Sequence, residues 1–211
     1  LNLGGIANIT CAMPDKHVAF DVGAANQVLN ILAHEVEQAY DGNGEIAATG
    51  KVDMELLKTV NSIPYFQKKY PKTLDNQWVA KHIFPLYLEA NIPTADKLRT
   101  ACEQLAIQVA QSTQAILKKE KLQKESYQML ATGGGAFNGF LMDCIQAQCL
   151  NIANIEVVIP TDEIVQFKEA ILMGLMGVLR VENQYNCLSS VTGARRDTIG
   201  GAIYQGWKKQ V

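Results

Sequence analysis

Three consecutive glycines, Gly133–Gly135, lie between a predicted strand and a predicted helix, and they constrain the fold more than any other feature of the sequence. The apolar run Tyr127–Ala131 predicts the strand, and Phe137–Leu150 carries apolar residues at helical spacing. Where Cβ atoms are absent the backbone can approach a ligand closely, and the start of the following helix favours an anion. The spacing is that of neither a dinucleotide-binding turn nor a P-loop. A nucleotide-binding turn and an ordinary tight strand–helix turn are both compatible with it.

The order of the predicted elements indicates an α/β domain with a mixed sheet. Short strands at Leu1–Leu3, Ile6–Cys11 and His17–Val22 are joined by tight turns, which predicts an antiparallel meander. The last third alternates strand and helix, with Ile155–Ile159 followed by Glu163–Glu182, and this predicts parallel βα units. We therefore expect helices on both faces of the sheet. The other predicted helices are Ala25–Tyr40, Asp53–Asn61, Asn76–Glu89 and Ala95–Lys119, and a surface loop is predicted over Ile63–Gln77.

A second glycine turn, Gly4-Gly5, joins the first two predicted strands. Glycine tolerates positive φ, so we expect a turn that few other residues could form. The exposed N–H groups of such a turn can bind phosphate oxygens. Judged by spacing alone, a plain glycine hairpin turn is the favoured explanation of the same two residues.

Two carboxylates are candidate site residues. Asp21 ends a predicted strand beside Gly23, where open α/β sheets bind ligands, and could hold a metal-bound water or a sugar hydroxyl. Stabilising the local turn is the commoner role for an aspartate at such a place. Glu169 lies in an otherwise apolar helix that we expect to be buried, where a carboxylate must be paired or face a cleft. The alternative is an exposed residue next to Lys168.

Composition narrows the range of partners. Lys and Arg number 19 against 21 Asp and Glu, a net charge of −2, which argues against a nucleic-acid-binding surface. No apolar run reaches the roughly 18 residues that a membrane span needs. The 5 cysteines are scattered without a CxxC pair, which predicts free thiols in a reducing cytoplasm and no metal site.

The order of these motifs resembles the second lobe of the superfamily that contains acetate and sugar kinases, heat-shock chaperones and actin. In detail the sequence is similar to the anhydro-N-acetylmuramic acid kinases, and the resemblance covers Leu1 to about Tyr204. The segments that carry it are Leu1–Thr10, Ile63–Phe66, Pro71–Thr73, Thr132–Asn138, Lys168–Ala170 and Ser190–Ala194.

The resemblance implies a ribonuclease H-like (actin-like ATPase) domain and an ATP-dependent sugar kinase. The family transfers the γ-phosphate of ATP to the 6-hydroxyl of 1,6-anhydro-N-acetylmuramic acid while water opens the anhydro ring, a step of cytoplasmic cell-wall sugar recycling. Mg²⁺ would bridge the phosphates. The implied nucleotide-binding residues are Gly4, Gly5, Asn8, Gly133, Gly134, Gly135 and Asn138, and the implied sugar-side residues are Asp21, Asn26 and Glu169.

The sequence departs from the family pattern at two places, and part of the pattern is absent. The usual D-T-G-P-G-N is Asp21–Asn26 with Val22, Ala24 and Ala25, and the usual P-K-S-x-G is Pro71–Asp75. The family's first phosphate loop and its general base are expected upstream of Leu1. Residues 1–211 are therefore expected to be the carboxyl-terminal lobe of a two-lobed kinase that does not turn over without its amino-terminal lobe. A homodimer is a further candidate state. The alternatives are a kinase for another 1,6-anhydro or amino sugar, and a non-catalytic actin-like nucleotide-binding module.

Overall fold

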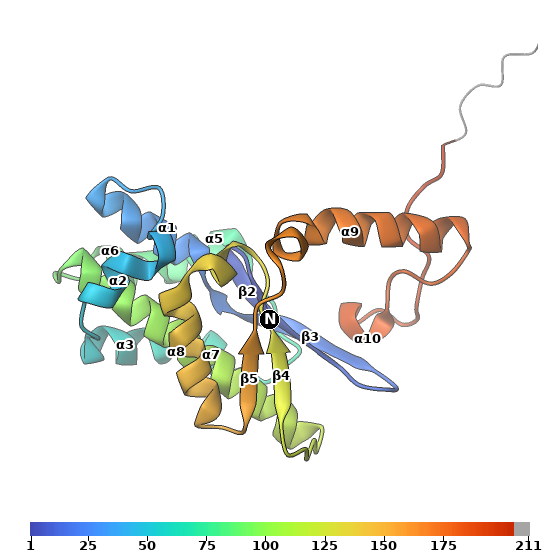
Figure 1. Ribbon diagram of the computed structural model, residues 1–211, viewed down its shortest axis with the longest axis horizontal. Helices are drawn as coiled ribbons and strands as arrows, with labels where there is room; N and C mark the ends of the chain where they lie inside the picture. Colours follow the sequence, from blue (N-terminus) through green and yellow to red (C-terminus); the bar gives the residue numbers. More distant parts are fainter. Residues whose placement is uncertain (205–211) are drawn as a thin grey trace, which may run out of the picture.

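Strand β1 joins two small sheets into one continuous arrangement. The computed structural model describes residues 1–204, in which β1, β2 and β3 are antiparallel and β4 and β5 pair in parallel (Figure 1). Asn2 forms a parallel bridge to Thr132, just beyond β4, and the Leu3 N–H donates to the Thr132 carbonyl at 2.7 Å. The spatial order is therefore β3-β2-β1-β4-β5, which confirms the predicted meander and parallel pair. The strands are β1 Asn2–Leu3, β2 Ile6–Ala12, β3 His17–Ala24, β4 Tyr127–Leu130 and β5 Ile155–Val158.

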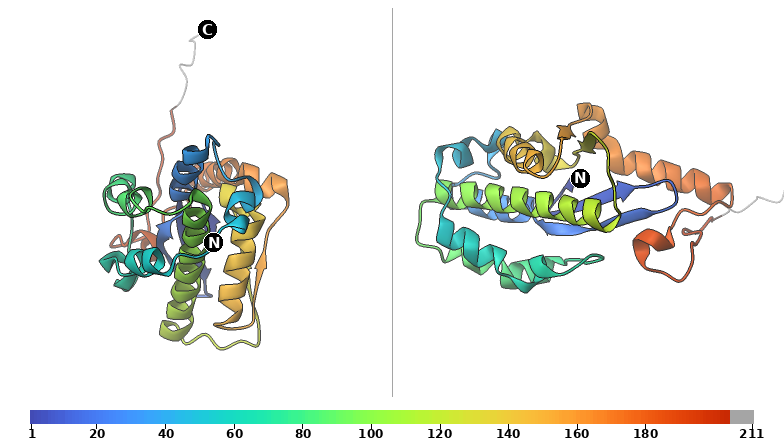
Figure 2. Two further views of the ribbon diagram at one scale, coloured as in Figure 1. Left: turned by 90° about the vertical axis from the view of Figure 1, so that its left-hand side faces the viewer. Right: turned by 90° about the horizontal axis from the view of Figure 1, so that it is seen from below.

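The 26-residue helix α7 (Thr94–Lys119) organises the core. Its side chains Leu98, Leu105 and Val109 are at most 2 % exposed, and the helix runs along the domain against α8 and the strands (Figure 2). Apolar residues at helical spacing predicted this helix, and burying the stripe is what stabilises it. The other helices are α1 Asn26–Ala33, α2 Glu45–Thr49, α3 Met54–Asn61, α4 Pro64–Gln67, α5 Asn76–His82, α6 Phe84–Leu88, α8 Gly139–Leu150, α9 Asp162–Val181 and α10 Ser189–Thr192, with 3₁₀ turns η1 His34–Val36, η2 Gly42–Gly44 and η3 Gly134–Phe137.

Helices cover one face of the sheet well and the other poorly. Ile9 and Met129 are buried, whereas Thr10 and Leu130, the next residues along the same strands, are exposed, Leu130 by 52 %. Such alternation is typical of a sheet packed on one side only. The prediction of helices on both faces is thus met in residues 1–204 only for the face that α7 and α8 occupy.

A β-bulge lies in β3 next to the candidate aspartate. Ala7 of β2 pairs with Gly23, but the next residue, Asn8, pairs with Asp21, so Val22 is the extra residue. Val22 is completely buried. Bulges of this kind bend a strand and redirect the residues that follow, and they are frequent next to functional sites.

Two predicted helices end earlier than expected. The helix predicted over residues 25–40 stops at Ala33, continues as one 3₁₀ turn, and then reverses at Glu37, whose φ is +58°. The helix predicted over residues 76–89 is two helices that break at Ile83, because Pro85 has no N–H to donate within a continuous helix.

The segment predicted as a surface loop contains a short helix with buried aromatic rings. Tyr65 and Phe66 of α4 are 3 % and 7 % exposed, and the Tyr65 hydroxyl donates to the Asp21 carbonyl at 2.6 Å. The loop is therefore an integral part of the fold beside β3.

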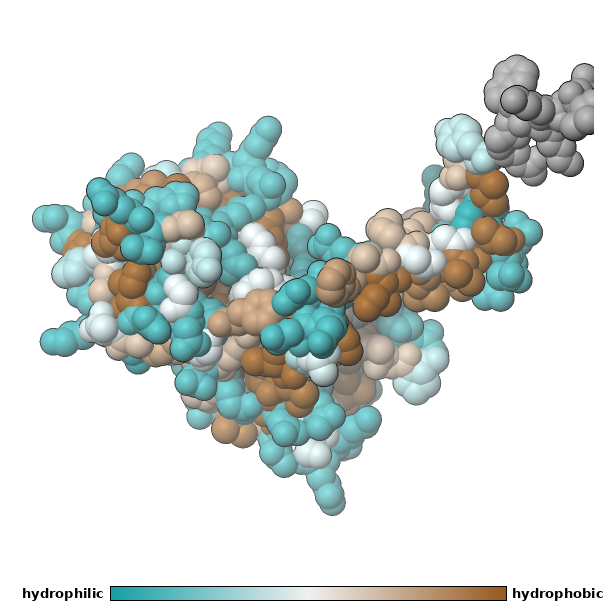
Figure 3. Space-filling model, turned by 45° about the horizontal axis from the view of Figure 1, so that its top comes forward, coloured by the Kyte–Doolittle hydropathy of each residue, from teal (hydrophilic) through white to brown (hydrophobic). Residues whose placement is uncertain are grey.

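Helix α9 contradicts the expectation of a buried helix. It extends away from the domain (Figure 1), and apolar side chains remain visible on the projecting part of the molecule (Figure 3). Phe167, Ile171 and Val178 are 57 %, 58 % and 60 % exposed. Apart from the neighbouring backbone of α9 itself, no heavy atom of residues 1–204 lies within 4 Å of a Cβ built on Gly174 or Gly177, so no other described element packs closely against these two glycines.

Within residues 1–204, no helix combines the length and the apolar character needed to cross a membrane.

Candidate functional site

The two glycine turns meet at one edge of the sheet. Gly133 has φ +84°, a conformation that favours glycine, and a Cβ at this position would lie 2.7 Å from the Leu3 carbonyl oxygen. A Cβ on Gly135 would lie 2.7 Å from the Leu3 Cβ. The absence of side chains at Gly133 and Gly135 therefore lets the turn after β4 pack directly against the end of β1.

Asn26, at the start of α1, connects the two turns. Its Nδ2 donates to the Leu3 carbonyl at 3.2 Å, and its backbone N–H donates to the Gly4 carbonyl at 3.1 Å. Its Oδ1 lies 3.0 Å from the place where a Cβ on Gly135 would stand. The structure thus brings together three of the predicted site segments: the first glycine turn, Asn26 and the three glycines.

The positive φ expected at Gly4 and Gly5 is not found. Neither has the positive φ that would require glycine. Space is the constraint at Gly5, because a Cβ there would lie 3.0 Å from the Gln27 Cγ. Gln27 was missed in the sequence: its Nε2 donates to Asn76 at 2.7 Å, and its Oε1 is buried without a hydrogen-bond partner within residues 1–204.

A cleft of about 410 Å³ opens beside the glycine-rich turn. Gly134, Gly135, Asn138 and Asn26 line it, as predicted site residues, and Tyr40 and Phe137 contribute rings that are 66 % and 45 % exposed. Exposed aromatic rings of this kind can stack on a planar ligand. Its remaining lining residues are Leu29, Asn30, Asp41 and Asn43.

The turn Asp41–Gly44, directly after the helix predicted to end at Tyr40, supplies two further cleft residues, Asp41 and Asn43. The Asp41 carboxylate accepts the N–H groups of Ile46 and Ala47, both at 2.9 Å, and so holds the start of α2. The Asn43 Oδ1 accepts the Gly139 N–H at 3.0 Å. Four turn-forming residues in succession were the available signal, but only the fold shows that they face the glycine-rich turn.

Asn138 has a structural role in addition to its place in the cleft. Its Oδ1 accepts the Leu141 N–H at 2.9 Å and caps α8. The predicted helix therefore begins after Asn138, at Gly139, and the glycines themselves form a 3₁₀ turn.

Asn8 and Asp21 lie on adjacent strands but do not line this cleft. They pair across β2 and β3. The Asp21 Oδ2 accepts the Thr73 hydroxyl and the Leu74 N–H, both at 2.8 Å, so this carboxylate anchors the loop after α4. The turn-stabilising role considered for Asp21 is thus present in the structure, and it leaves Oδ1 without a hydrogen bond from residues 1–204.

Glu169 lies near the site but is exposed. Its neighbour Lys168 is the residue that reaches inward: its Nζ donates to the Asn2 Oδ1 and, at 3.3 Å, to the Thr132 hydroxyl. Lys168 therefore ties the start of α9 to the bridge between β1 and β4. In the sequence, Lys168 stands out only as part of the segment Lys168–Ala170.

No group of three or more His, Cys, Asp and Glu residues in the described part of the chain is placed to hold a metal ion. The cleft is lined by amide, glycine and aromatic residues, by Leu29 and by Asp41, whose carboxylate is bonded internally. Amide groups can hydrogen-bond a ligand, and aromatic rings can stack on one.

The mixed sheet, with two glycine turns that meet at one edge beside a cleft, defines an α/β domain of the kind in which ligands bind at the ends of the strands. Sequence comparison gives the family. The family model described as anhydro-N-acetylmuramic acid kinase matches residues 1–206, and the chain belongs to that family.

Curated relatives bear the same description. The anhydro-N-acetylmuramic acid kinase of Sulfurovum sp. is 30 % identical over 210 residues, covering 97 % of this chain and 54 % of the relative. That of Streptomyces coelicolor is 31 % identical over 220 residues, covering 98 % of this chain and 52 % of the relative. The chain spans about half the length of the curated relatives it matches.

Among solved structures, the activator of the 2-hydroxyisocaproyl-CoA dehydratase from Clostridium difficile with bound ADPNP aligns with a TM-score of 0.41 at 18 % identity, over 81 % of this chain and 55 % of that chain. A likeness at this level does not establish a common fold.

Proposed function

We propose that this chain is the carboxyl-terminal lobe of an ATP-dependent kinase that phosphorylates 1,6-anhydro-N-acetylmuramic acid at the 6-hydroxyl and opens the anhydro ring, in cytoplasmic recycling of cell-wall sugar. Membership of the family supports the reaction class, and the chain's span of about half its relatives supports a second lobe. The observation that carries the proposal is the meeting of the Gly4-Gly5 turn and the Gly133–Gly135 turn across Leu3 and Asn26. The strand order β3-β2-β1-β4-β5 supports the ribonuclease H-like (actin-like ATPase) form of the domain.

The nucleotide is proposed to lie along the edge where the two turns meet. Gly133, Gly134, Gly135 and Asn138 would hold the adenosine and the α-phosphate, with Tyr40 and Phe137 beside the base. Gly4, Gly5 and Asn8 would face the β- and γ-phosphates; the carbonyls of Gly4 and Gly5 hold the start of α1. Backbone N–H groups at turns and helix starts suit phosphate oxygens.

Mg²⁺ is proposed to bind together with the nucleotide and to bridge its phosphates. Bound Mg²⁺ neutralises phosphate charge during phosphoryl transfer.

The sugar is proposed to contact Asp21, Asn26 and Glu169 in a site that the other lobe would complete. Of these three residues only Asn26 lines the glycine-rich cleft. Asp21 has a carboxylate oxygen that no group in residues 1–204 occupies, whereas its second oxygen is fixed by Thr73 and Leu74. A carboxylate fixed in this way can orient a sugar hydroxyl.

The general base is proposed to lie in the other lobe, so that residues 1–211 alone do not turn over. Asp21→Asn in the full-length protein tests this assignment. If Asp21 only positions sugar, the variant should raise KM and lower kcat by less than the roughly 10²–10⁴-fold that a general base contributes. A larger loss of kcat with unchanged KM would identify Asp21 as the base and overturn the assignment to the other lobe.

The exposed side of α9 is proposed to pack against that other lobe. Its side chains Phe167, Ile171 and Val178 are more than half exposed, and a contiguous apolar face of this kind is typical of an interaction surface. A homodimer through the same face is the alternative. Sedimentation of the full-length protein and of residues 1–211 would separate them: a monomeric full-length protein with a self-associating fragment supports lobe packing.

The experiment that tests the activity uses the full-length protein. Release of ADP from ATP that depends on 1,6-anhydro-N-acetylmuramic acid, together with thermal stabilisation by the sugar, is the expected result. ADP release with a different anhydro or amino sugar would favour another kinase of the same kind. Thermal stabilisation by nucleotide without any effect of sugars would favour a non-catalytic nucleotide-binding module.

A further inference from the structure

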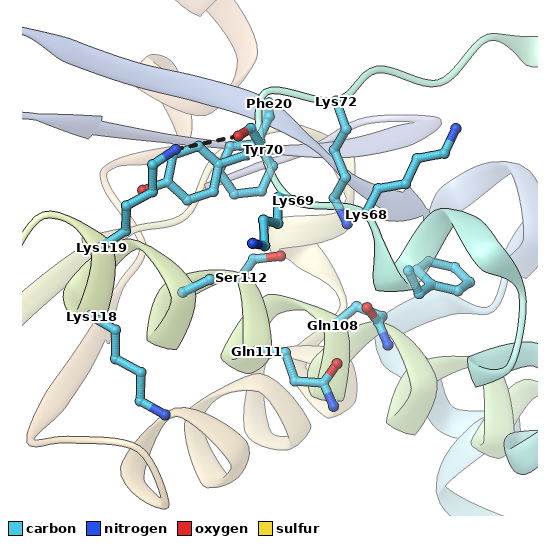
Figure 4. Close-up of a pocket in the computed structure, with 12 residues that line it drawn as sticks. Phe20, Lys68, Lys69, Tyr70, Lys72, Gln108, Gln111, Ser112, Lys118 and Lys119 are labelled. Atoms are coloured by element: carbon cyan, nitrogen blue, oxygen red, sulfur yellow. Dashed lines mark hydrogen bonds between the residues drawn. The ribbon is translucent and has the colours of Figure 1, made fainter.

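A second cavity, about 490 Å³ in volume, lies between the loop after α4 and the carboxyl-terminal half of α7 (Figure 4). Its lining and that of the glycine-rich cleft have no residue in common. We call it the basic pocket, because five of its lining residues are Lys68, Lys69, Lys72, Lys118 and Lys119. The lysines come from two elements on opposite sides of the cavity.

The charge of the basic pocket is not balanced by nearby carboxylates. No Asp or Glu lines it, although acidic residues outnumber basic ones in the chain as a whole. The ion pairs within residues 1–204 involve Lys16 and Lys97, neither of which lines the pocket. The nearest carboxylate, Glu120, is engaged by Lys16 and by the Tyr70 hydroxyl, although it also attracts Lys119.

Aromatic rings hold two of the ammonium groups without neutralising them. Phe20 and Tyr70 stack with ring centroids 4.8 Å apart, and the Lys119 Nζ lies 4.0 Å from the Tyr70 centroid. The Lys72 Nζ lies 4.6 Å from the Tyr65 centroid. Each of these ammonium groups has one long hydrogen bond of 3.5 Å to a backbone carbonyl. Cation–π contacts of this kind orient a cation and preserve its charge.

Lys72 is the most enclosed of the five. Removal from water lowers its pKa below the ordinary value, which means that the charged form is stabilised less here than in solution. An anion placed beside Lys72 would restore that stabilisation. A cavity of this size is within the range that accommodates small metabolites.

We propose that the basic pocket binds a small phosphorylated molecule with two or more negative charges, at a site separate from the glycine-rich cleft. Five lysines from two elements line the pocket, and a set of positive charges of this kind matches a polyanion better than a single carboxylate does. Lysine binds phosphate as a point charge. A pocket of about 490 Å³, as opposed to a long basic stripe along the surface, fits a small molecule better than a nucleic acid.

A ligand bound in the basic pocket would affect the position of Asp21. The Asp21 N–H donates to the Lys72 carbonyl at 3.1 Å, and the next two residues of the loop bond its carboxylate. A ligand that holds Lys72 would restrict the loop and, with it, the orientation of that carboxylate.

Calorimetric titration of inorganic pyrophosphate into the full chain tests the proposal. The titration is done at about 0.15 M salt, because salt of this concentration screens non-specific attraction between exposed charges. The expected result is saturable binding with one site. The variant Lys68→Gln/Lys69→Gln/Lys118→Gln should weaken it about tenfold or more, which is a loss of at least ~1.4 kcal/mol. All three side chains are exposed, so this variant should fold.

The matched control is Lys51→Gln/Lys58→Gln/Lys81→Gln, which removes the same charge from exposed lysines outside the pocket. It should leave pyrophosphate affinity unchanged. The proposal is overturned if saturable binding is absent or if both variants weaken binding equally. It is also overturned if a non-hydrolysable ATP analogue displaces pyrophosphate and the pocket variant still binds that analogue. Tighter binding of a short single-stranded RNA than of pyrophosphate, lost in the pocket variant, would also overturn it.

Discussion

The Asn26 side-chain amide donates to the Leu3 carbonyl oxygen at 3.2 Å, and through this bond the start of α1 holds the end of β1. The same carbonyl lies against Gly133. Because the contact joins both glycine turns, the geometry of the candidate site depends on it.

Replacing Asn26 with alanine should destabilise the chain by about 1–3 kcal/mol, because the Leu3 carbonyl would lose a partner in a confined position. Urea unfolding of the chain measures this. Asn30→Ala is the matched control, since Asn30 lines the same cleft and its side chain makes no hydrogen bond within residues 1–204. Equal unfolding midpoints for the two variants would show that the bond is unimportant.

Gly133→Ala and Gly134→Ala should differ sharply in stability. At Gly133 the alanine would have φ +84° and a Cβ 2.7 Å from a carbonyl oxygen, a strain of about 1–3 kcal/mol before any steric clash is counted. At Gly134 the nearest atom would be 3.6 Å away, so the unfolding free energy should change by less than ~0.5 kcal/mol.

Gly134→Ala also separates folding from binding. The added methyl group would project at the cleft, so the affinity of the full-length protein for ATP should fall while its thermal stability without ligand does not. Unchanged affinity for ATP in this variant would place the nucleotide elsewhere.

Asp21 and Thr73 should be energetically coupled. Their side chains share a hydrogen bond of 2.8 Å, so the cycle of Asp21→Asn, Thr73→Val and the double variant should give a coupling free energy of about 0.5–3 kcal/mol. Denaturant unfolding of the four proteins measures it. The pair Asp53→Asn and Thr73→Val is the control: Asp53 caps α3 through Leu56 and shares no partner with Thr73, so their effects should add.

Glu120 should give the chain part of its acid sensitivity. Hydrogen bonds from Lys16 and then from Tyr70 hold the pKa of Glu120 below its ordinary value. A carboxyl with a lowered folded pKa stabilises the fold above its unfolded pKa of about 4.3, and this stabilisation is lost as the pH falls through the folded pKa. Glu120→Gln should therefore reduce the drop in urea midpoint between pH 7 and pH 3.

The exposed Glu125, for which no side-chain partner occurs within residues 1–204, provides the comparison. Glu125→Gln should leave the pH profile as it is in the unmodified chain. Parallel profiles for the Glu120 and Glu125 variants would contradict the assignment.

Helix α9 should bind a hydrophobic dye in this chain. Phe167→Gln/Val178→Gln should lower dye fluorescence without lowering the urea midpoint, because both side chains are more than half exposed. Val165→Gln on the same helix is the contrasting variant: Val165 is 7 % exposed, and burying a polar amide there should cost about 1–3 kcal/mol. Equal destabilisation by both variants would show that the face of α9 is covered.

The features that the sequence predicted well depend on local chemistry. The short turns correctly predicted the antiparallel meander, and the alternation of strand and helix correctly predicted the parallel pair. Gly133 has the positive φ typical of glycine, whereas Gly4 and Gly5 do not. A larger side chain at Gly5 would instead be crowded by Gln27, and such a tertiary contact cannot be predicted from turn rules.

The features that it missed depend on packing between distant segments. Tyr40 and Phe137 line one cleft although 97 positions separate them in the chain (137 minus 40), and no periodicity links them. The apolar pattern of α9 correctly predicted a helix. Such a pattern shows which face of a helix is apolar, but it does not show whether another part of this chain covers that face.

The extra residue in β3 has a consequence for which sequences can replace one another here. Val22 is accommodated outside the one-to-one pairing of β2 and β3. The number of residues from Asp21 to Asn26 therefore decides whether Asp21 can bond the loop after α4 while Asn26 bonds the Leu3 carbonyl. A change in the length of this segment is therefore expected to disturb the site more than a change in the identity of these residues. On this basis Val22, Ala24 and Ala25 can stand where relatives of the expected pattern have Thr, Pro and Gly, whereas a one-residue deletion would separate the two functions.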